Sequence, residues 1–335
     1  MLHTPIRITH QPPLRCVLVH GGEPHIAVPL CQLLASDGAV RVVRSGGGGS
    51  EPLAPAPNLR IGTEPVASLL TFEPIDAVVL LGPRARVLSS PAAEAQIGAA
   101  LDLLPLLADH CRRMPPDARA RMRIIQLASD RVFGGLPLGE GSFNGDSRYR
   151  PTGLAAAAQA AADHFLAAAA AEQDLPLIRA YHPKLYGPHQ PAGELVPRVI
   201  AAAVAQAPIR LTGTGATERD WLHVEDLAAA LAAIIWHGLA GSGYAIGARC
   251  VLNERAIAQR ICDLADRFDP PINGQRRRAL IGFASPERPR DLRRALDPFR
   301  AETGLGWRPA HDFDATLLEL IDAAIGAHRP VALAG

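Results

Sequence analysis

The stretch from Cys16 to Val43, CVLVHGGEPHIAVPLCQLLASDGAVRVV, decides the fold that this sequence predicts. Its two short apolar runs, Cys16–His20 and Ala39–Val43, are typical of buried strands, because strands covered on both faces are apolar throughout. The segment between them, His25–Ala35, has the length and apolar spacing of a helix. A strand, a helix and a second strand in this order predict a βαβ unit with parallel strands.

The same alternation continues to residue 180. Further strands are predicted at 76–81, 122–128 and 176–180, and helices at 92–113 and in the Ala-rich segment 153–165. We therefore expect an α/β fold with a Rossmann-like doubly wound parallel sheet.

The pattern loosens after residue 180, where Pro and Gly become more frequent. Helices are predicted at 193–205, 224–237, 253–267 and 312–325, around a short strand at 209–211. We expect a Rossmann-like domain over 1–182 and a smaller C-terminal substrate lobe over 183–335, interleaved with the first.

The composition argues for a small-molecule partner. With 34 basic and 33 acidic residues the net charge is +1, which gives no long-range field to attract nucleic acid or an anionic membrane. No apolar run has the length of a signal sequence or a membrane span. The five cysteines are scattered and never spaced as CxxC, so neither a disulfide framework nor a metal site is indicated. We expect a cytoplasmic protein.

The segment GTGATERDWLHVEDLAAAL, Gly213–Leu231, resembles the extended short-chain dehydrogenase/reductases, and within them the NAD-dependent nucleotide-sugar 4,6-dehydratases and 4-epimerases. The chain also matches this epimerase/dehydratase family, in order and spacing, at ASDRVFG (128–134), LYGP (185–188), GYAIG (243–247), RPRDLRR (288–294) and LGWRP (305–309). The resemblance implies a Rossmann domain for NAD(P) and a lobe for a nucleoside diphosphate sugar. It also implies a homodimer formed through two long helices.

The family's catalytic Tyr-x-x-x-Lys motif is missing from this sequence. Aligning Asp163 and His164 with the Asp-His that follows the motif puts Ala155 at the tyrosine position and Gln159 at the lysine position. No tyrosine of this chain is followed four residues later by a lysine, because Lys184 is the only lysine. Alanine cannot take a proton, and general base catalysis needs a titratable group near the substrate.

The glycine loop that would hold the cofactor also departs from the family. GGEPHIA, Gly21–Ala27, stands where the family has G-x-x-G-x-x-G, so Pro24 replaces the second glycine. A proline ring fills space and its nitrogen donates no hydrogen bond. Arg44 stands where an acidic residue would bind the ribose, and it could instead meet a 2′-phosphate. We interpret Gly21, Gly22 and Arg44 as vestigial cofactor residues, and we expect no bound cofactor, neither NAD nor NADP.

The candidate site residues lie in segments that match the family. Asp130 remains from the dehydratase acid pair, and Lys184 replaces an asparagine that contacts the sugar, so we expect both to be catalytic; the alternatives are a turn cap and a surface ammonium. Arginine forks suit a diphosphate, although such arginines also form structural ion pairs. We expect five residues to bind the substrate: Tyr186, Arg219, Arg288, His182 and His223.

These observations leave three hypotheses about function. The first is a repurposed non-redox enzyme of specialised metabolism, a lyase, isomerase or cyclase, that has lost the family's NAD(P)-dependent chemistry. The second is a catalytically inactive subunit that binds a sugar nucleotide or pairs with an active paralogue through the long helices. The third, ranked last, is a residual NADP-dependent epimerase or dehydratase.

Overall fold

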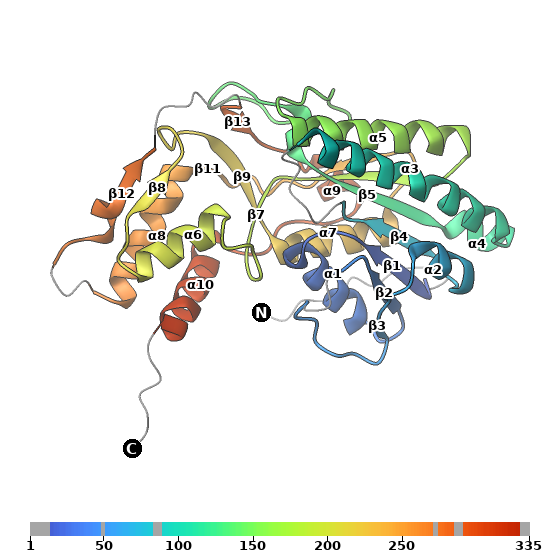
Figure 1. Ribbon diagram of the computed structural model, residues 1–335, viewed down its shortest axis with the longest axis horizontal. Coiled ribbons are helices and arrows are strands. Elements are labelled where there is room, and N and C mark those ends of the chain that lie inside the picture. The colour runs from blue at the N-terminus through green and yellow to red at the C-terminus, as the bar shows by residue number, and fades with distance from the viewer. Residues whose placement is uncertain (1–13, 48–50, 83–88, 271–273, 285–290, 329–335) are drawn as a thin grey trace, which may run out of the picture.

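The computed structural model describes residues 14–47, 51–82, 89–270, 274–284 and 291–328. Within these residues, a seven-stranded parallel sheet runs through the larger part of the molecule in the order β10-β6-β5-β4-β1-β2-β3 (Figure 1). Its strands are β1 (Cys16–His20), β2 (Arg41–Ser45), β3 (Leu59–Ile61), β4 (Ala77–Leu80), β5 (Arg123–Ser129), β6 (Leu177–His182) and β10 (Gly243–Ala245). The predicted α/β fold with a Rossmann-like sheet is confirmed.

Helices cover both faces of this sheet, which explains its continuous apolar strands. On one face, alternate residues such as Val17 and Val19 of β1 pack with α1 (Pro24–Ser36) and α7 (Val224–His237). On the other face, Cys16 and Leu18 belong to a core that includes residues of α2, α3 and α5. These helices span Val66–Phe72, Ser90–Arg113 and Leu154–Glu172, and a short helix α4 (Pro116–Arg121) leads into β5.

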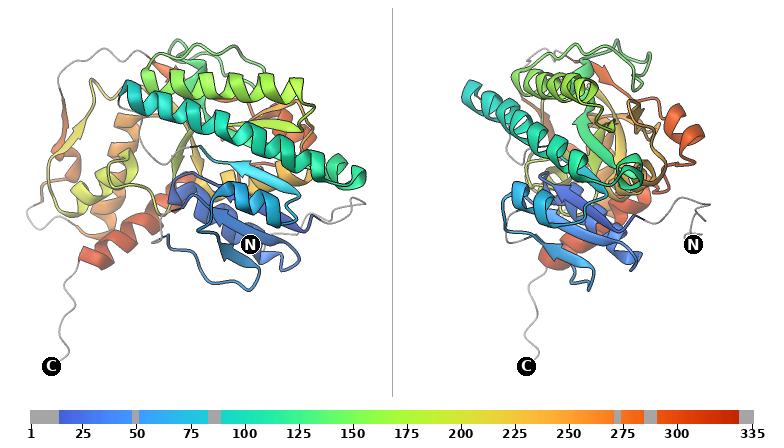
Figure 2. Two further views of the ribbon diagram at one scale, coloured as in Figure 1. Left: turned by 45° about the vertical axis from the view of Figure 1, so that its right-hand side comes forward. Right: turned by 90° about the vertical axis from the view of Figure 1, so that its right-hand side faces the viewer.

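Helices α3 and α5 lie side by side along one face of the sheet, as both views in Figure 2 show. Alanine gives α5 a high helix propensity, and its small side chains allow the two helices to approach closely. The helix therefore continues to Glu172, seven residues beyond the predicted end at Phe165.

Helix α5 also passes a length and composition test for membrane spans, with a mean hydropathy of 1.2, and no other helix of the described residues does. The expectation that no segment reaches such a length is corrected for this helix. Because α5 packs along α3 and places Leu166 and Ala170 in the core beneath the sheet, we interpret it as a packed helix of the fold.

The smaller lobe lies beside the sheet unit, at the left of Figure 1. Its apolar core joins three helices, α6 (Leu195–Val204), α8 (Glu254–Phe268) and α10 (Phe313–His328). Two small sheets complete it, one formed by β7 (Lys184–Tyr186), β9 (Glu218–His223), β11 (Val251–Asn253) and β13 (Arg293–Arg294), the other by β8 (Ile209–Leu211) and β12 (Ile281–Phe283).

The chain passes between the two units more than once. After β9 it returns to the large sheet as α7 and β10, and α9 (Phe299–Gly304) packs near β10. Residues after 182 contribute an edge strand and a covering helix to the first unit. The division into 1–182 and 183–335 stays a prediction.

Candidate functional site

The carboxyl ends of β5 and β6 carry the polar side chains predicted for the site, at the edge where open α/β sheets bind ligands. Ser129 ends β5 and pairs with His182 at the end of β6. The backbone N–H of Ser129 donates to Oε1 of Gln159, 3.2 Å away. Gln159, at the family's lysine position, therefore faces the end of β5 from helix α5.

Asp130 follows directly and is 2% exposed. Its Oδ1 accepts hydrogen bonds from Nε of Arg294 at 3.2 Å and from Oγ of Ser129 at 3.3 Å. Its Oδ2 is buried and has no hydrogen-bond partner within the described part of the chain. The N-cap of the following 3₁₀ turn is Ser129, whose Oγ accepts from the N–H of Arg131. The alternative that Asp130 caps this turn is therefore not supported.

Arg294 joins the two lobes at Asp130. Its Nη1 also donates to Oδ2 of Asp291 at 3.0 Å, and Thr152 donates to the same carboxylate at 2.7 Å. Arg219 donates from Nη2 to the carbonyl oxygen of Asp291 at 3.0 Å. Burial, and then the positive charge of Arg294, lowers the pKa of Arg219 to about 10. The structure thus brings Arg219 to the Asp130 network, as expected for residues of one site.

Sequence analysis missed Arg294, Asp291 and Thr152 as members of this network. The first two lie in the RPRDLRR motif that carried the resemblance, so the motif was the available signal. Arg288, the residue selected from that motif, lies outside the described residues.

Lys184 and His182 lie near α1. Lys184 forms an ion pair with Glu194, and the side chains of both are about one third exposed. Nδ1 of His182 lies 2.8 Å from the carbonyl oxygen of Pro183, and burial lowers the pKa of His182. Burial, followed by the charge of His182, also lowers the pKa of His25, in the first turn of α1, to about 4. Groups of both lobes therefore face each other here.

Tyr186 and His223 line a different space from the other predicted residues. Their rings meet edge to face with centroids 5.3 Å apart, and Tyr186 is 2% exposed. They line a cavity of about 480 Å³ that also borders His311, and whose lining includes neither Asp130, Lys184 nor Arg219. Tyr186 and His223, both expected to bind the substrate, therefore line a space apart from that of Asp130, Lys184 and Arg219.

The glycine turn after β1 is intact. Gly21 and Gly22 have φ of +70° and +77°, and a Cβ atom on Gly22 would lie 2.4 Å from Cβ of Leu81. Only glycine fits this turn. Pro24 is the first residue of α1, a position whose N–H has no partner inside a helix, so proline is compatible with the loop here. The backbone of this loop therefore accommodates Pro24.

Arg44 is fully buried at 0% exposure, and its guanidinium is bound by its own chain. Nε and Nη2 donate to Glu51 at 3.0 and 2.8 Å, and Nη1 donates to the carbonyl oxygen of Ser45 at 2.6 Å. A weaker contact, from Nη2 at 3.4 Å, reaches the carbonyl oxygen of Gly22. Because Glu51 already neutralises this guanidinium, the alternative that Arg44 meets a 2′-phosphate is not supported.

The geometry of a Rossmann sheet with an intact glycine turn agrees with comparisons to known proteins. Residues 17–247 match the model of a family described as NAD dependent epimerase/dehydratase. The chain belongs to this family. The predicted resemblance is thereby confirmed.

The chain is also similar to named dTDP-glucose 4,6-dehydratases. The chain is 31% identical over 223 residues to a dTDP-glucose 4,6-dehydratase of Xanthomonas campestris pv. campestris, covering 66% of this chain and 63% of that enzyme. It is 32% identical over 222 residues to the dTDP-glucose 4,6-dehydratase of Neisseria gonorrhoeae, covering 66% and 64%. The matched region thus spans less than two thirds of these relatives.

Two solved structures share the fold over nearly the whole chain. The dTDP-glucose 4,6-dehydratase of Streptomyces venezuelae, with NAD bound, superimposes with a TM-score of 0.78 at 23% identity, covering 94% of this chain and 98% of that one. The UDP-glucuronic acid 4-epimerase of Bacillus cereus, in complex with UDP-glucuronic acid and NAD, gives 0.76 at 18% identity, covering 93% and 100%.

These findings correct two expectations. The family is NAD-dependent, and neighbours of this fold were solved with NAD, so the expected loss of NAD(P)-dependent chemistry and the expected absence of a cofactor are wrong. Pro24, which was counted as a lost glycine, is accepted by the backbone of this loop because it is the first residue of α1. The hypothesis of a non-redox lyase, isomerase or cyclase is withdrawn with them.

Proposed function

We propose that this protein is an NAD-dependent enzyme that dehydrates or epimerises the sugar of a nucleoside diphosphate sugar. The proposal rests on the position of Asp130. Its carboxylate is buried at the end of β5 and accepts a hydrogen bond from Arg294 of the other lobe. Its Oδ2 lacks a partner among the described residues, and a sugar hydroxyl would supply one. The related enzymes act, by their names, on dTDP-glucose and UDP-glucuronic acid.

The residues at the end of β1 fit the pyrophosphate of NAD. Gly21 and Gly22 let the backbone turn tightly, and the N-terminus of the 13-residue helix α1 favours negative charge. Because Arg44 is already neutralised by Glu51, the described residues at the end of β2 offer NADP no free cation, and we expect NAD to be preferred. Bound NAD supplies a reversible acceptor for the hydride of a sugar carbon.

Asp130 is proposed to accept the proton of the reacting sugar hydroxyl. Ala155 cannot perform proton transfer, so a titratable group at another position must do so. Oδ2 of Asp130 is available, while Arg294 and Ser129 fix the carboxylate through Oδ1. Gln159 holds the backbone of Ser129 and thereby the position of the carboxylate.

The remaining candidates are proposed to bind the substrate. Arg219 belongs to the Asp130 network, and it is proposed to bind the diphosphate together with Arg288. His182 lies at the same strand ends. Lys184 keeps its predicted catalytic role as a separate proposal, in which its ammonium would exchange Glu194 for an anionic group of the substrate.

The test is titration of the full chain with NAD⁺ and NADP⁺ by calorimetry, followed by incubation with NAD⁺ and dTDP-glucose or UDP-glucuronic acid under NMR. We expect NAD⁺ to bind more tightly than NADP⁺ and one sugar nucleotide to be converted. Failure of folded protein to bind NAD⁺ would overturn the cofactor assignment.

Asp130→Asn is expected to lower turnover at least about a hundredfold, the range of a lost acid–base group. Asp146→Asn, which removes an ion pair with Arg300 at the surface, is the matched control and should retain activity. Full activity of Asp130→Asn would remove Asp130 from the mechanism, and full activity of Lys184→Ala would do the same for Lys184.

A further inference from the structure

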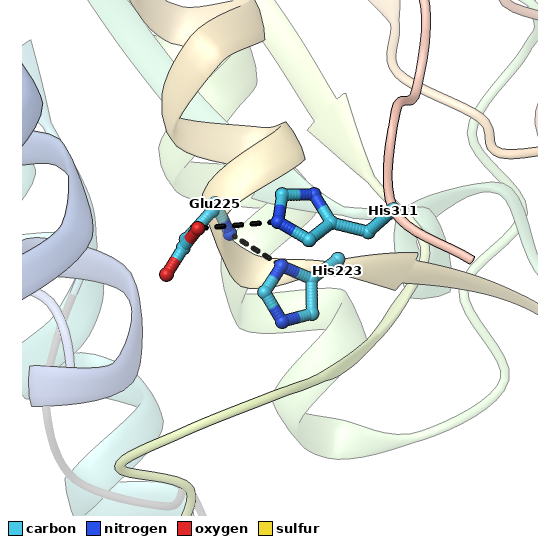
Figure 3. Close-up of side chains that lie close together, drawn as sticks. All are labelled: His223, Glu225 and His311. Atoms are coloured by element: carbon cyan, nitrogen blue, oxygen red, sulfur yellow. Dashed lines mark hydrogen bonds and ion pairs between the residues drawn. The ribbon is translucent and has the colours of Figure 1, made fainter. Parts of the chain in front are cut away.

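Two histidines from distant parts of the chain meet at the cavity that Tyr186 lines. His223 ends β9 and caps α7, while His311 lies in the segment before α10. Their rings stack with centroids 4.0 Å apart and planes inclined by 24° (Figure 3). Neither histidine is part of the Asp130 network described above.

Glu225 completes a set of three potential ligands. Its Oε2 lies 3.2 Å from Nε2 of His311, and one donor atom of each of His223, Glu225 and His311 lies within 4.8 Å of the other two. His223 is buried, whereas the side chains of His311 and Glu225 are 27% and 55% exposed. An ion could therefore reach the cluster from solvent.

A buried carboxylate orients one of these ligands. Oδ1 of Asp226 lies 2.8 Å from Nδ1 of His311, and the backbone N–H groups of Ala310 and His311 donate to the same carboxylate at 3.0 and 3.2 Å. With its proton on Nδ1, His311 directs the lone pair of Nε2 toward Glu225. A carboxylate behind a histidine is the arrangement that fixes the ring of a metal ligand and increases its basicity.

We propose that His223, Glu225 and His311 bind one divalent transition-metal ion of the zinc type. Two imidazoles and a carboxylate are ligands that Zn²⁺ prefers, with bonds of about 2.0–2.2 Å. Such bonds require donor atoms about 3.3–3.5 Å apart in a tetrahedron, so the three side chains must close by roughly an ångström. Glu225 is exposed enough to move, and His223 would give up a weak hydrogen bond of 3.3 Å from the N–H of Glu225.

The cavity leaves room for a fourth ligand. His223 and His311 both line its volume of about 480 Å³, together with Cys250, Arg260 and Asp314. Water or an anionic small molecule in this cavity would complete the coordination, as in zinc sites that keep one position open. Through His311 and His223, the ion would also link the segment before α10 to the start of α7.

The test uses the full chain, treated with a chelator and then titrated with ZnCl₂ by calorimetry and with Co²⁺ by visible absorption. We expect one equivalent of Zn²⁺ to bind and Co²⁺ to give the strong visible bands of a tetrahedral site with nitrogen ligands. Glu225→Gln and His311→Gln should each weaken binding at least tenfold. His237→Gln on α7 and Glu319→Gln on α10 are matched controls that should bind as the wild type does.

Unchanged Zn²⁺ binding in both Glu225→Gln and His311→Gln would overturn the site, as would a Co²⁺ spectrum typical of octahedral water ligands. Melting curves without metal establish that each variant is folded. Should His311→Gln not fold, Glu225→Gln decides the outcome, because its side chain is more than half exposed. None of these measurements depends on NAD or on sugar-nucleotide turnover.

Discussion

At the scale of single residues, the molecule contains buried charges that are paired with a charge of opposite sign. Arg44 with Glu51 and Asp130 with Arg294 are the two cases next to the proposed site. Removing one member of such a pair leaves the other charge without compensation in a medium that solvates it poorly. These positions are therefore where single substitutions have their largest effects on stability.

We expect Glu51→Gln to lower the free energy of unfolding by about 3–5 kcal/mol, because the buried guanidinium of Arg44 would lose its counter-charge. Glu64→Gln removes the exposed ion pair with Arg60 and should cost less than about 1 kcal/mol. Urea denaturation of both variants measures the difference. Equal losses would contradict the burial argument.

His25 gives stability a pH dependence of defined sign. Its pKa falls from 6.5 to about 4 on folding because the ring is buried. Between these pH values His25 is protonated in the unfolded chain and neutral in the folded chain. Its contribution to the free energy of unfolding is therefore complete above pH 6.5 and is lost as the pH falls toward 4. The loss attributable to His25 is about 3 kcal/mol.

His25→Gln should therefore make the decline in stability between pH 6.5 and 4 shallower than in the wild type, as measured by urea denaturation at several pH values. His164→Gln, at an exposed position on α5, is the control for replacing a histidine with glutamine. An identical slope in the wild type and His25→Gln would exclude His25 as the group responsible.

Candidate residues could be selected from sequence only where a motif marked them. Asp130 and Arg219 were found in this way, and the structure joins them through Asp291 and Arg294. Nothing in the spacing indicated that His223 would stack on His311, since the two residues are 88 positions apart and only tertiary packing brings them together.

At the scale of elements, the turn between β1 and α1 is the proposed binding site of the NAD pyrophosphate. Gly22 N–H donates to the carbonyl oxygen of Gly82 at 2.7 Å, which ties this turn to the end of β4. The conformation depends on two positive φ angles in succession, at Gly21 and Gly22. The turn is therefore sensitive to any added side chain.

Gly22→Ala should destabilise the protein by more than about 1 kcal/mol and abolish NAD⁺ binding, because its Cβ would overlap Leu81 in a conformation that alanine adopts poorly. Gly38→Ala is the control for backbone strain without overlap, since φ there is +41° but a Cβ meets nothing within 4 Å, and it should retain NAD⁺ binding. Melting temperature and NAD⁺ calorimetry test both variants. Wild-type binding by Gly22→Ala would mean that the cofactor lies elsewhere.

The long strands and helices were predictable because their apolar patterns span several turns or a full strand. The predicted strand Cys16–His20 and helix Val224–His237 agree with β1 and α7. Among three-residue strands, β8 was predicted at 209–211, whereas β3 and β7 were missed, since so few residues carry no periodicity and their pairing is decided by neighbouring strands.

At the scale of the whole molecule, α3 and α5 carry exposed apolar side chains on their outer face. Leu101 on α3 and Leu154 and Phe165 on α5 are 40%, 46% and 49% exposed. The homodimer through the long helices stays a prediction, as do the heterodimer with a paralogue and the cytoplasmic location. This face is where either pairing is expected.

Light scattering should give twice the monomer mass of 35.5 kDa, and Phe165→Arg should shift the protein toward monomer by placing charge in the helix interface. Phe268→Arg, at a similarly exposed position on α8, should leave the mass unchanged. A wild-type protein that is monomeric, or a dimer unaffected by Phe165→Arg, would remove α5 from the interface.

The late return of the chain to the large sheet has a consequence for synthesis on the ribosome. The edge of β6 is covered only when β10, at residues 243–245, has emerged, and α1 gains its partner helix α7 only after residue 224. A nascent chain that has reached residue 182 therefore exposes an unpaired strand and an apolar helix face. Folding of the first unit must wait for the second, and a truncated gene product ending there would be prone to aggregate.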